Sequence, residues 1–190
     1  MNHRLSFRVL FFLILFSSLF GFADPKLLKC AFPGKTEFTN FDSCAFRNQD
    51  GSIGIEKSVF KKIDFDKSGL AGGSIGNDGC FWLNKKGLLR KTFCYDNGAD
   101  YFQEGLARYV GPDGLFGYIN KKLKIVIPAK YSFGFPFSKG NARVCQGCKE
   151  EKTTDSEHTS LAGGQWMILN IKGEIVKTCL DAKRYDDCDK

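Results

Sequence analysis

Short runs of apolar residues alternate with polar turns along most of the chain. The clearest two runs are FGYIN at 116–120 and KIVIP at 124–128, with polar residues between them. Both runs are rich in β-branched and aromatic residues, which is typical of strands. No stretch after residue 23 shows an apolar period of 3.6 residues over helical length. The pattern therefore predicts an all-β fold.

The apolar runs recur as a unit. Asp-Gly pairs stand at 50–51, 78–79 and 113–114, and a Gly-Gly pair at 163–164 takes the place of a fourth. Each pair is followed by an apolar run that ends in Asn or Glu and at least one Lys. The second glycines of the pairs are 28, 35 and 50 residues apart. Internal periods of this size indicate an array whose units bury their apolar faces against their neighbours.

Each unit is predicted to be three short antiparallel strands joined by two turns. In the clearest copy, GLARYV at 105–110 is the first strand, and FGYIN and KIVIP are the second and third. We expect the Asp-Gly pair to supply the positive φ angles of a tight hairpin turn. The units are placed at about 41–64, 65–101, 102–136 and 137–187 of a single domain, 24–190, with a polar insertion at 145–162. The pattern fits an open array and a barrel or propeller-like closure equally.

The segment from Phe102 to Tyr131 resembles the WG (or KWG) repeat family of bacterial proteins. It reads FQEGLARYV and then LFGYINKKLKIVIPAKY, where Phe116 stands at the Trp position and Asn120 at an Asp position of the family pattern. The fourth unit keeps the tryptophan as Trp166. The resemblance covers about 41–187, closely in one unit and loosely in the others. It implies a β repeat and, by analogy with other arrays, a binding surface, but no settled activity.

The first 23 residues have the features of a secretory signal peptide. Two arginines precede an uncharged apolar stretch from Val9 to Phe20. Gly21 and Ala23 then place small residues before a predicted cut ahead of Asp24. The stretch is too short to span a bilayer comfortably, so we expect cleavage and export to the periplasm or the exterior.

The net charge is only mildly basic. Removal of the two signal-peptide arginines lowers the formal net charge from +7 to +5. This bias is smaller than that of a dedicated nucleic-acid-binding protein, so no nucleic-acid partner is expected.

All eight cysteines lie after the predicted cut, at Cys30, Cys44, Cys80, Cys94, Cys145, Cys148, Cys179 and Cys188. An even number beyond an export signal predicts disulfides formed in an oxidising compartment. Among about 105 pairing schemes we predict the local one: 30–44, 80–94, 145–148 and 179–188. The second pair flanks the NKKG turn at 84–87, so its members are expected on neighbouring strands.

Cys145 and Cys148 also have two functional interpretations. A redox-active pair should open a helix, whose N-terminus lowers the pKa of the first thiol. Here the pair follows the strand-like NARV and precedes a polar loop. A zinc site would need two more thiolates, such as Cys179 and Cys188. A disulfide at the base of the insertion is the structural alternative.

Lysines occupy what is predicted to be the same turn in four units, at Lys57, Lys85, Lys86, Lys121, Lys122 and Lys172. If the units stack in register, these turns line one edge as a basic stripe. Such a stripe would attach to an anionic surface such as polysaccharide or lipid headgroups. The alternative is four separate solvated turns.

Two further patterns do not support a catalytic or metal site. The segment 64–69 imitates the first half of a calcium-binding loop, but Ile75 stands where the bidentate Glu is needed. His158, the one histidine after the predicted cut, lies in the polar insertion, where we expect a solvated loop. No catalytic residue, cofactor or metal ligand is therefore predicted.

The sequence thus predicts an exported repeat protein without catalytic activity that binds a macromolecule, either an anionic envelope surface or another protein. The alternative is a thiol-redox or metal-binding envelope protein that uses Cys145 and Cys148. Counting thiols in the native protein separates the two.

Overall fold

The computed structural model describes residues 27–152, 159–179 and 187–188. The predicted signal peptide and His158 lie outside the described residues. Within the described part, the regular secondary structure is almost entirely β-strand and includes one short α-helix, α1 (Lys57–Phe60). No helix of this part is long and apolar enough to cross a membrane. The predicted all-β class is therefore confirmed.

The strands are β1 (Leu28–Pro33), β2 (Phe38–Arg47), β3 (Ile53–Ile55), β4 (Leu70–Ile75), β5 (Gly79–Asn84), β6 (Leu89–Thr92), β7 (Cys94–Tyr95), β8 (Gly98–Ala99), β9 (Leu106–Val110), β10 (Phe116–Asn120), β11 (Ile125–Tyr131), β12 (Phe133–Gly134), β13 (Asn141–Gln146), β14 (Lys149–Lys152), β15 (Thr159–Ala162), β16 (Gln165–Asn170) and β17 (Ile175–Cys179).

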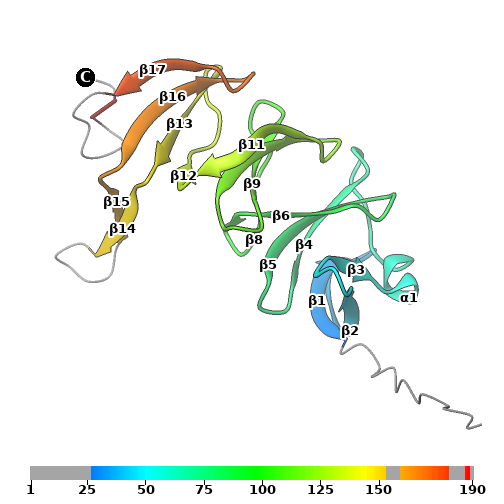
Figure 1. The fold of residues 1–190 in the computed structure, drawn as a ribbon. Helices are drawn as coiled ribbons and strands as arrows, with labels where there is room; N and C mark the ends of the chain where they lie inside the picture. Colours follow the sequence, from blue (N-terminus) through cyan, green and yellow to red (C-terminus); the bar gives the residue numbers. More distant parts are fainter. Residues whose placement is uncertain (1–26, 153–158, 180–186, 189–190) are drawn as a thin grey trace, which may run out of the picture.

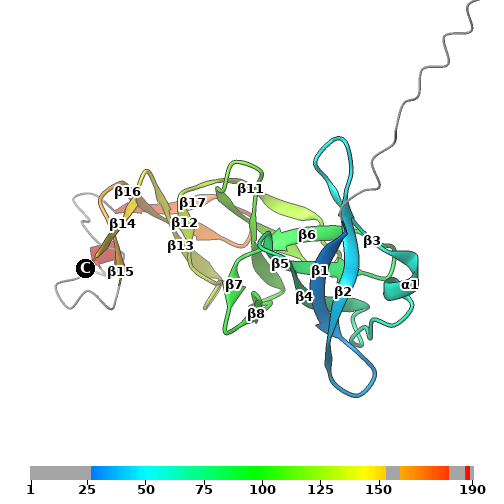
Figure 2. The same ribbon diagram turned by 90° about the horizontal axis from the view of Figure 1, so that it is seen from below.

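Three antiparallel meanders repeat along the chain: β4–β5–β6, β9–β10–β11 and β13–β16–β17. The first two belong to one nine-stranded sheet of order β11-β10-β9-β6-β5-β4-β1-β2-β3, and the third forms a four-stranded sheet with β12. Figures 1 and 2 show the units following one another from β1–β3 at one end of the molecule to β16–β17 at the other. The nine-stranded sheet ends in two different edge strands and does not close, so the repeat array is open.

The first unit departs from the predicted pattern. Strand β3 has three residues, and α1 follows it where a third strand of the unit was expected. Strand β1, which the repeat pattern did not include, pairs with both β2 and β4 and so joins this end to the next unit. The physical reason is that Val59 and Ile63, on and just after α1, supply the burial that a third strand would have given.

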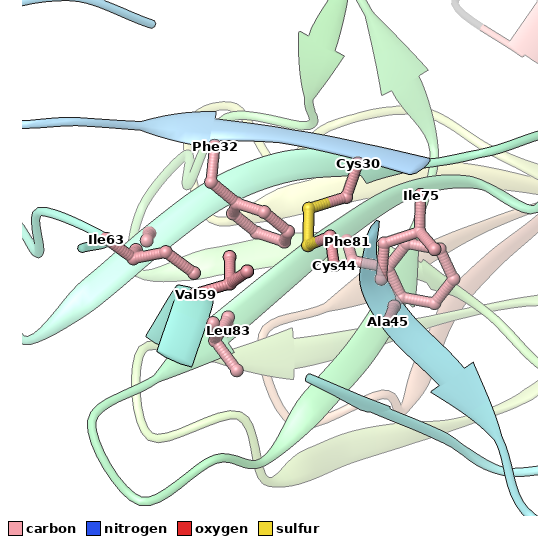
Figure 3. Packing of buried hydrophobic residues seen from close by; sticks show 10 residues of the cluster. Cys30, Phe32, Cys44, Ala45, Val59, Ile63, Ile75, Phe81 and Leu83 are labelled. Atoms are coloured by element: carbon pink, nitrogen blue, oxygen red, sulfur yellow. A yellow bond between two sulfur atoms is a disulfide. The ribbon is translucent and has the colours of Figure 1, made fainter. Parts of the chain in front are cut away.

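A separate apolar core fills each junction between neighbouring units. The first core joins β1, β2 and α1 to β4 and β5, and Figure 3 shows its side chains around the Cys30–Cys44 disulfide. The second core joins β4 and the β9–β11 meander. The third joins that meander to β13 and β16 through side chains such as Ile127 and Met167. Each unit therefore covers its neighbour's apolar face, as expected for an array.

The predicted role of the Asp-Gly pairs is wrong in its geometry. At Asp113-Gly114 only the glycine has a positive φ, +80°. The Gly114 N–H donates to the Gly111 carbonyl, so the loop is a type I turn followed by a left-handed glycine. Both central residues have positive φ instead at Glu104-Gly105, with 51° and 84°. The tight two-residue turn thus lies before the first strand of the unit and not after it.

Candidate binding groove and thiol cluster

A groove of about 1060 Å³ lies against the nine-stranded sheet. Its wall includes Ile53 of the edge strand β3 and Ile125 of the opposite edge strand β11, with β5, β6 and β9 between them. The sheet therefore curls so that both of its edges reach the same hollow. This volume is at the upper end of the range of small-molecule pockets.

The centre of the groove is a gap between two neighbouring strands. Strand β6 pairs with β5 over four residue pairs but with β9 at the single pair Thr92–Tyr109. Away from this pair the two strands diverge, and Leu89, Arg90, Lys91 and Val110 line the space between them. The groove is thus a split between two repeat units.

The charged side chains of the groove differ in whether an opposite charge neutralises them. Arg47 Nη2 lies 2.7 Å from both carboxylate oxygens of Asp78, so these two charges neutralise each other. Arg90 Nε donates to the Leu123 carbonyl at 3.3 Å. Among the described residues, neither Arg90 nor Lys91 has an ion-pair partner. The centre of the groove therefore keeps two positive charges.

A buried ion pair fixes β9, one of the strands that line the groove. Asp100 and Arg108 are 2% and 3% exposed, and the carboxylate accepts hydrogen bonds from Nε at 3.0 Å and Nη2 at 2.6 Å. The same carboxylate accepts the backbone N–H of Arg108 at 2.9 Å. Arg108 Nη1 donates to the Gly134 carbonyl, and its guanidinium lies 4.3 Å from the centre of the Phe93 ring. The pair ties β9 to the preceding loop and to β12.

The Asn-Lys turns have the same hydrogen bonds in three units. Asn120 Oδ1 accepts the N–H groups of Lys122 and Lys124, and the turns that begin at Asn84 and Asn170 repeat this pattern. The fourth position of each turn is left-handed, at Gly87, Leu123 and Gly173. These turns place Lys85, Lys86, Lys121, Lys122 and Lys172 at exposed tips.

Lys57 does not belong to this set. It begins α1, because the first unit has a helix where the other units have their Asn turn. The predicted basic stripe is therefore reduced to three turns. Two of these turns contact the third strand of the preceding unit. The Leu123 carbonyl accepts a hydrogen bond from Arg90 of β6, and Gly173 lies against Ile127 of β11.

Three of the four predicted disulfides are present: Cys30–Cys44, Cys80–Cys94 and Cys179–Cys188. Three disulfides indicate an oxidising environment outside the cytoplasm. Cys80 lies on β5 and Cys94 just beyond β6, so this bond links neighbouring strands as expected.

The predicted Cys145–Cys148 disulfide is wrong: both residues are buried free thiols. The pKa of Cys145 is raised to about 12, mainly by burial and in smaller part by a hydrogen bond with Cys148. Thiol oxidation proceeds through the thiolate, so this raised pKa disfavours Cys145 as the attacking thiol of a redox pair.

The four cysteines at this end of the molecule form one cluster around Trp166. Cys145 and Cys179 lie opposite Trp166 on the two strands that flank it. Because Cys179 is bonded to Cys188, it cannot supply the thiolate that the predicted zinc alternative needs. Within the described residues, no group of three or more His, Cys, Asp or Glu is arranged to hold a metal ion. In the calcium-like segment, Asp66 Oδ1 accepts the N–H groups of Ser68 and Leu70.

The meanders, the shared turns and the cores between units define an open all-β repeat protein. Residues 116–149 match the family model described as "WG containing repeat". The chain thus contains a segment that matches a WG repeat, and the sequence-based recognition is confirmed for this segment. No curated protein and no solved structure matched the chain significantly.

The repeat signature has a structural explanation at its glycine. A Cβ at Gly117 would overlap the Ile127 carbonyl oxygen and would lie 2.7 Å from the Ala129 backbone nitrogen. Strand β11 therefore approaches β10 too closely for any side chain at this position.

Sequence reasoning missed the groove and the Asp100–Arg108 pair. Arg108 gave one signal, since it is a charged residue inside the apolar strand LARYV. A buried arginine needs a carboxylate partner, but nothing in the spacing identifies which acid that is.

Proposed function

We propose that the protein is an exported, non-enzymatic WG-repeat protein that binds another protein through the groove between its second and third repeat units. The observation that carries this proposal is the groove itself. It combines exposed aliphatic side chains, Leu88 and Ile125, with the unpaired charges of Arg90 and Lys91. Apolar contact area with a few charged groups is the usual composition of a protein-binding site.

Export is part of the same proposal. The N-terminal residues have the charge and hydropathy of a signal peptide. The three disulfides agree with a destination in the periplasm or the exterior. Attachment to an anionic surface through the lysine turns is the competing proposal. The groove is favoured because its charges lie in a concave, partly apolar site, whereas lysines at exposed tips are well solvated.

The test is differential capture from a cell-envelope extract of the host. We would compare the wild-type protein with Leu88→Arg in the groove and with Ile175→Arg as the matched control. Both positions carry exposed aliphatic side chains, but Ile175 lies on β17 of the last unit and does not line the groove. A charge placed among apolar contacts weakens an interface by desolvation and steric conflict.

We expect proteins captured by the wild type and by Ile175→Arg to be lost with Leu88→Arg. Equal capture by all three proteins would contradict binding through the groove. A set of proteins lost only with Ile175→Arg would move the binding surface to the end of the array. Recovery of anionic polysaccharide or lipid instead of protein would favour the lysine turns.

A further inference from the structure

Strand β6 has an unoccupied hydrogen-bonding edge inside the groove. The Asn84 N–H donates to the Leu88 carbonyl at 3.1 Å, and Trp82 lies opposite Arg90 in the register of β5 and β6. Because hydrogen-bonded pairs alternate along an antiparallel ladder, Leu89 and Lys91 direct their backbone groups away from β5. On that side β9 pairs with β6 only at Thr92. Since Thr92 bonds to β5, its neighbour Lys91 makes the contact with β9. The backbone of Leu89 therefore has no strand partner.

An open strand edge is a ready template for an added strand. Most edges are exposed at the rim of a sheet, but this one lies within a hollow with walls on both sides. Apolar side chains line both walls: Leu88 stands beside β6, and Ile125 and Pro128 stand on β11. An extended peptide in this position can bond to β6 through its backbone and place alternate side chains against these walls.

The charges select the kind of peptide. Of the two acids of the groove, Asp78 pairs with Arg47, whereas Asp113 Oδ1 accepts the Leu115 N–H and keeps its negative charge. The charged residues of the groove, Arg47, Asp78, Arg90, Lys91 and Asp113, still leave it net positive. Arg90 and Lys91, which flank the open edge, have no carboxylate partner among the described residues. Carboxylates on the incoming segment would complement both.

We propose that the groove binds an extended, acidic segment of a partner protein as an added β-strand along β6. This inference rests on the proposed function and narrows it to one class of partner and one mode of recognition. The strand supplies backbone hydrogen bonds to Leu89. Two adjacent acidic side chains of the strand face Arg90 on one side of the sheet and Lys91 on the other.

The test uses a short peptide with two adjacent glutamates between valines, measured by calorimetry at low salt against the full exported protein. A peptide with lysine in place of glutamate tests the charge. A valine–glutamate peptide with N-methyl groups along its pairing edge tests the backbone hydrogen bonds. Hydrogen exchange of the protein, with and without peptide, reports where the strand pairs.

We expect the valine–glutamate peptide to bind and to slow exchange of the Leu89 amide by tenfold or more, on the order of one formed hydrogen bond. The lysine and N-methylated peptides should bind weakly or not at all. Lys91→Gln should lower the affinity by about two- to fivefold, as for a partly exposed ion pair. Lys172→Gln, in a turn outside the groove, should leave it unchanged.

No binding at about 1 mM peptide, or binding that leaves the Leu89 amide unprotected, would overturn the added strand. If Leu88→Arg still abolishes capture from the extract in that case, the groove keeps its proposed function and only the mode of recognition is wrong. Binding of an acidic oligosaccharide in place of the peptide would also overturn the inference.

Discussion

Replacement of Asp100 by asparagine should remove a large part of the stability of the fold. The carboxylate accepts three hydrogen bonds from Arg108, one from the backbone and two from the guanidinium. Asparagine keeps one acceptor oxygen and turns an NH₂ donor toward a cation that is 3% exposed. The Gly134 carbonyl and the Phe93 ring would remain as the partners of that charge. Breaking a buried ion pair from one side costs about 3–5 kcal/mol.

The chain offers a matched control in the Arg47–Asp78 pair. Arg47 also reaches both carboxylate oxygens, but the two side chains are 48% and 29% exposed. Asp78→Asn should therefore cost less than about 1 kcal/mol. Equilibrium urea unfolding with the disulfides intact, followed by tryptophan fluorescence, measures both differences.

Comparable losses for Asp100→Asn and Asp78→Asn would refute the reasoning, because burial is the property that separates the two pairs. A double variant, Asp100→Leu with Arg108→Met, provides a second check. It leaves no unpaired buried charge, so it should be more stable than Asp100→Asn alone.

Three further predictions concern the repeat and the thiols. Gly117→Ala should lower the free energy of unfolding by about 1–3 kcal/mol, because its Cβ would overlap β11, while Gly98→Ala, where a Cβ has space, should change little; urea unfolding compares them. Asn120→Ala removes the acceptor of two backbone N–H groups and should cost about 0.5–2 kcal/mol in the same assay; an unchanged midpoint would show that the turn does not need the side chain. Because the pKa of Cys145 is raised to about 12, its thiol stays protonated at pH 9, where an ordinary thiol is largely ionised. Cys148 is also buried, so iodoacetamide should label both cysteines only after unfolding without reductant, and rapid labelling of the native protein would contradict this.

The local pattern of the sequence was enough to predict the units. FGYIN and KIVIP became β10 and most of β11, because alternating apolar residues and turn residues act over a few neighbours. Three disulfides were predicted for the same reason, since each closes a short loop. The predictions failed where tertiary packing outweighed the local sequence pattern. At Lys57 a helix stands where a lysine turn was predicted, and Val59 of this helix is buried in the first core. Cys145 and Cys148, which were predicted to be bonded, are buried free thiols.

The order of apolar and turn residues by itself determined that the chain forms β units in sequence, because strand and turn formation depend on near neighbours. The partner of Arg108 and the gap between β6 and β9 were decided only in three dimensions. Both arise from how one unit is rotated against the next, and that angle follows from the packing of side chains that are distant in the sequence. The candidate groove exists because two consecutive units share one sheet and yet separate after a single residue pair.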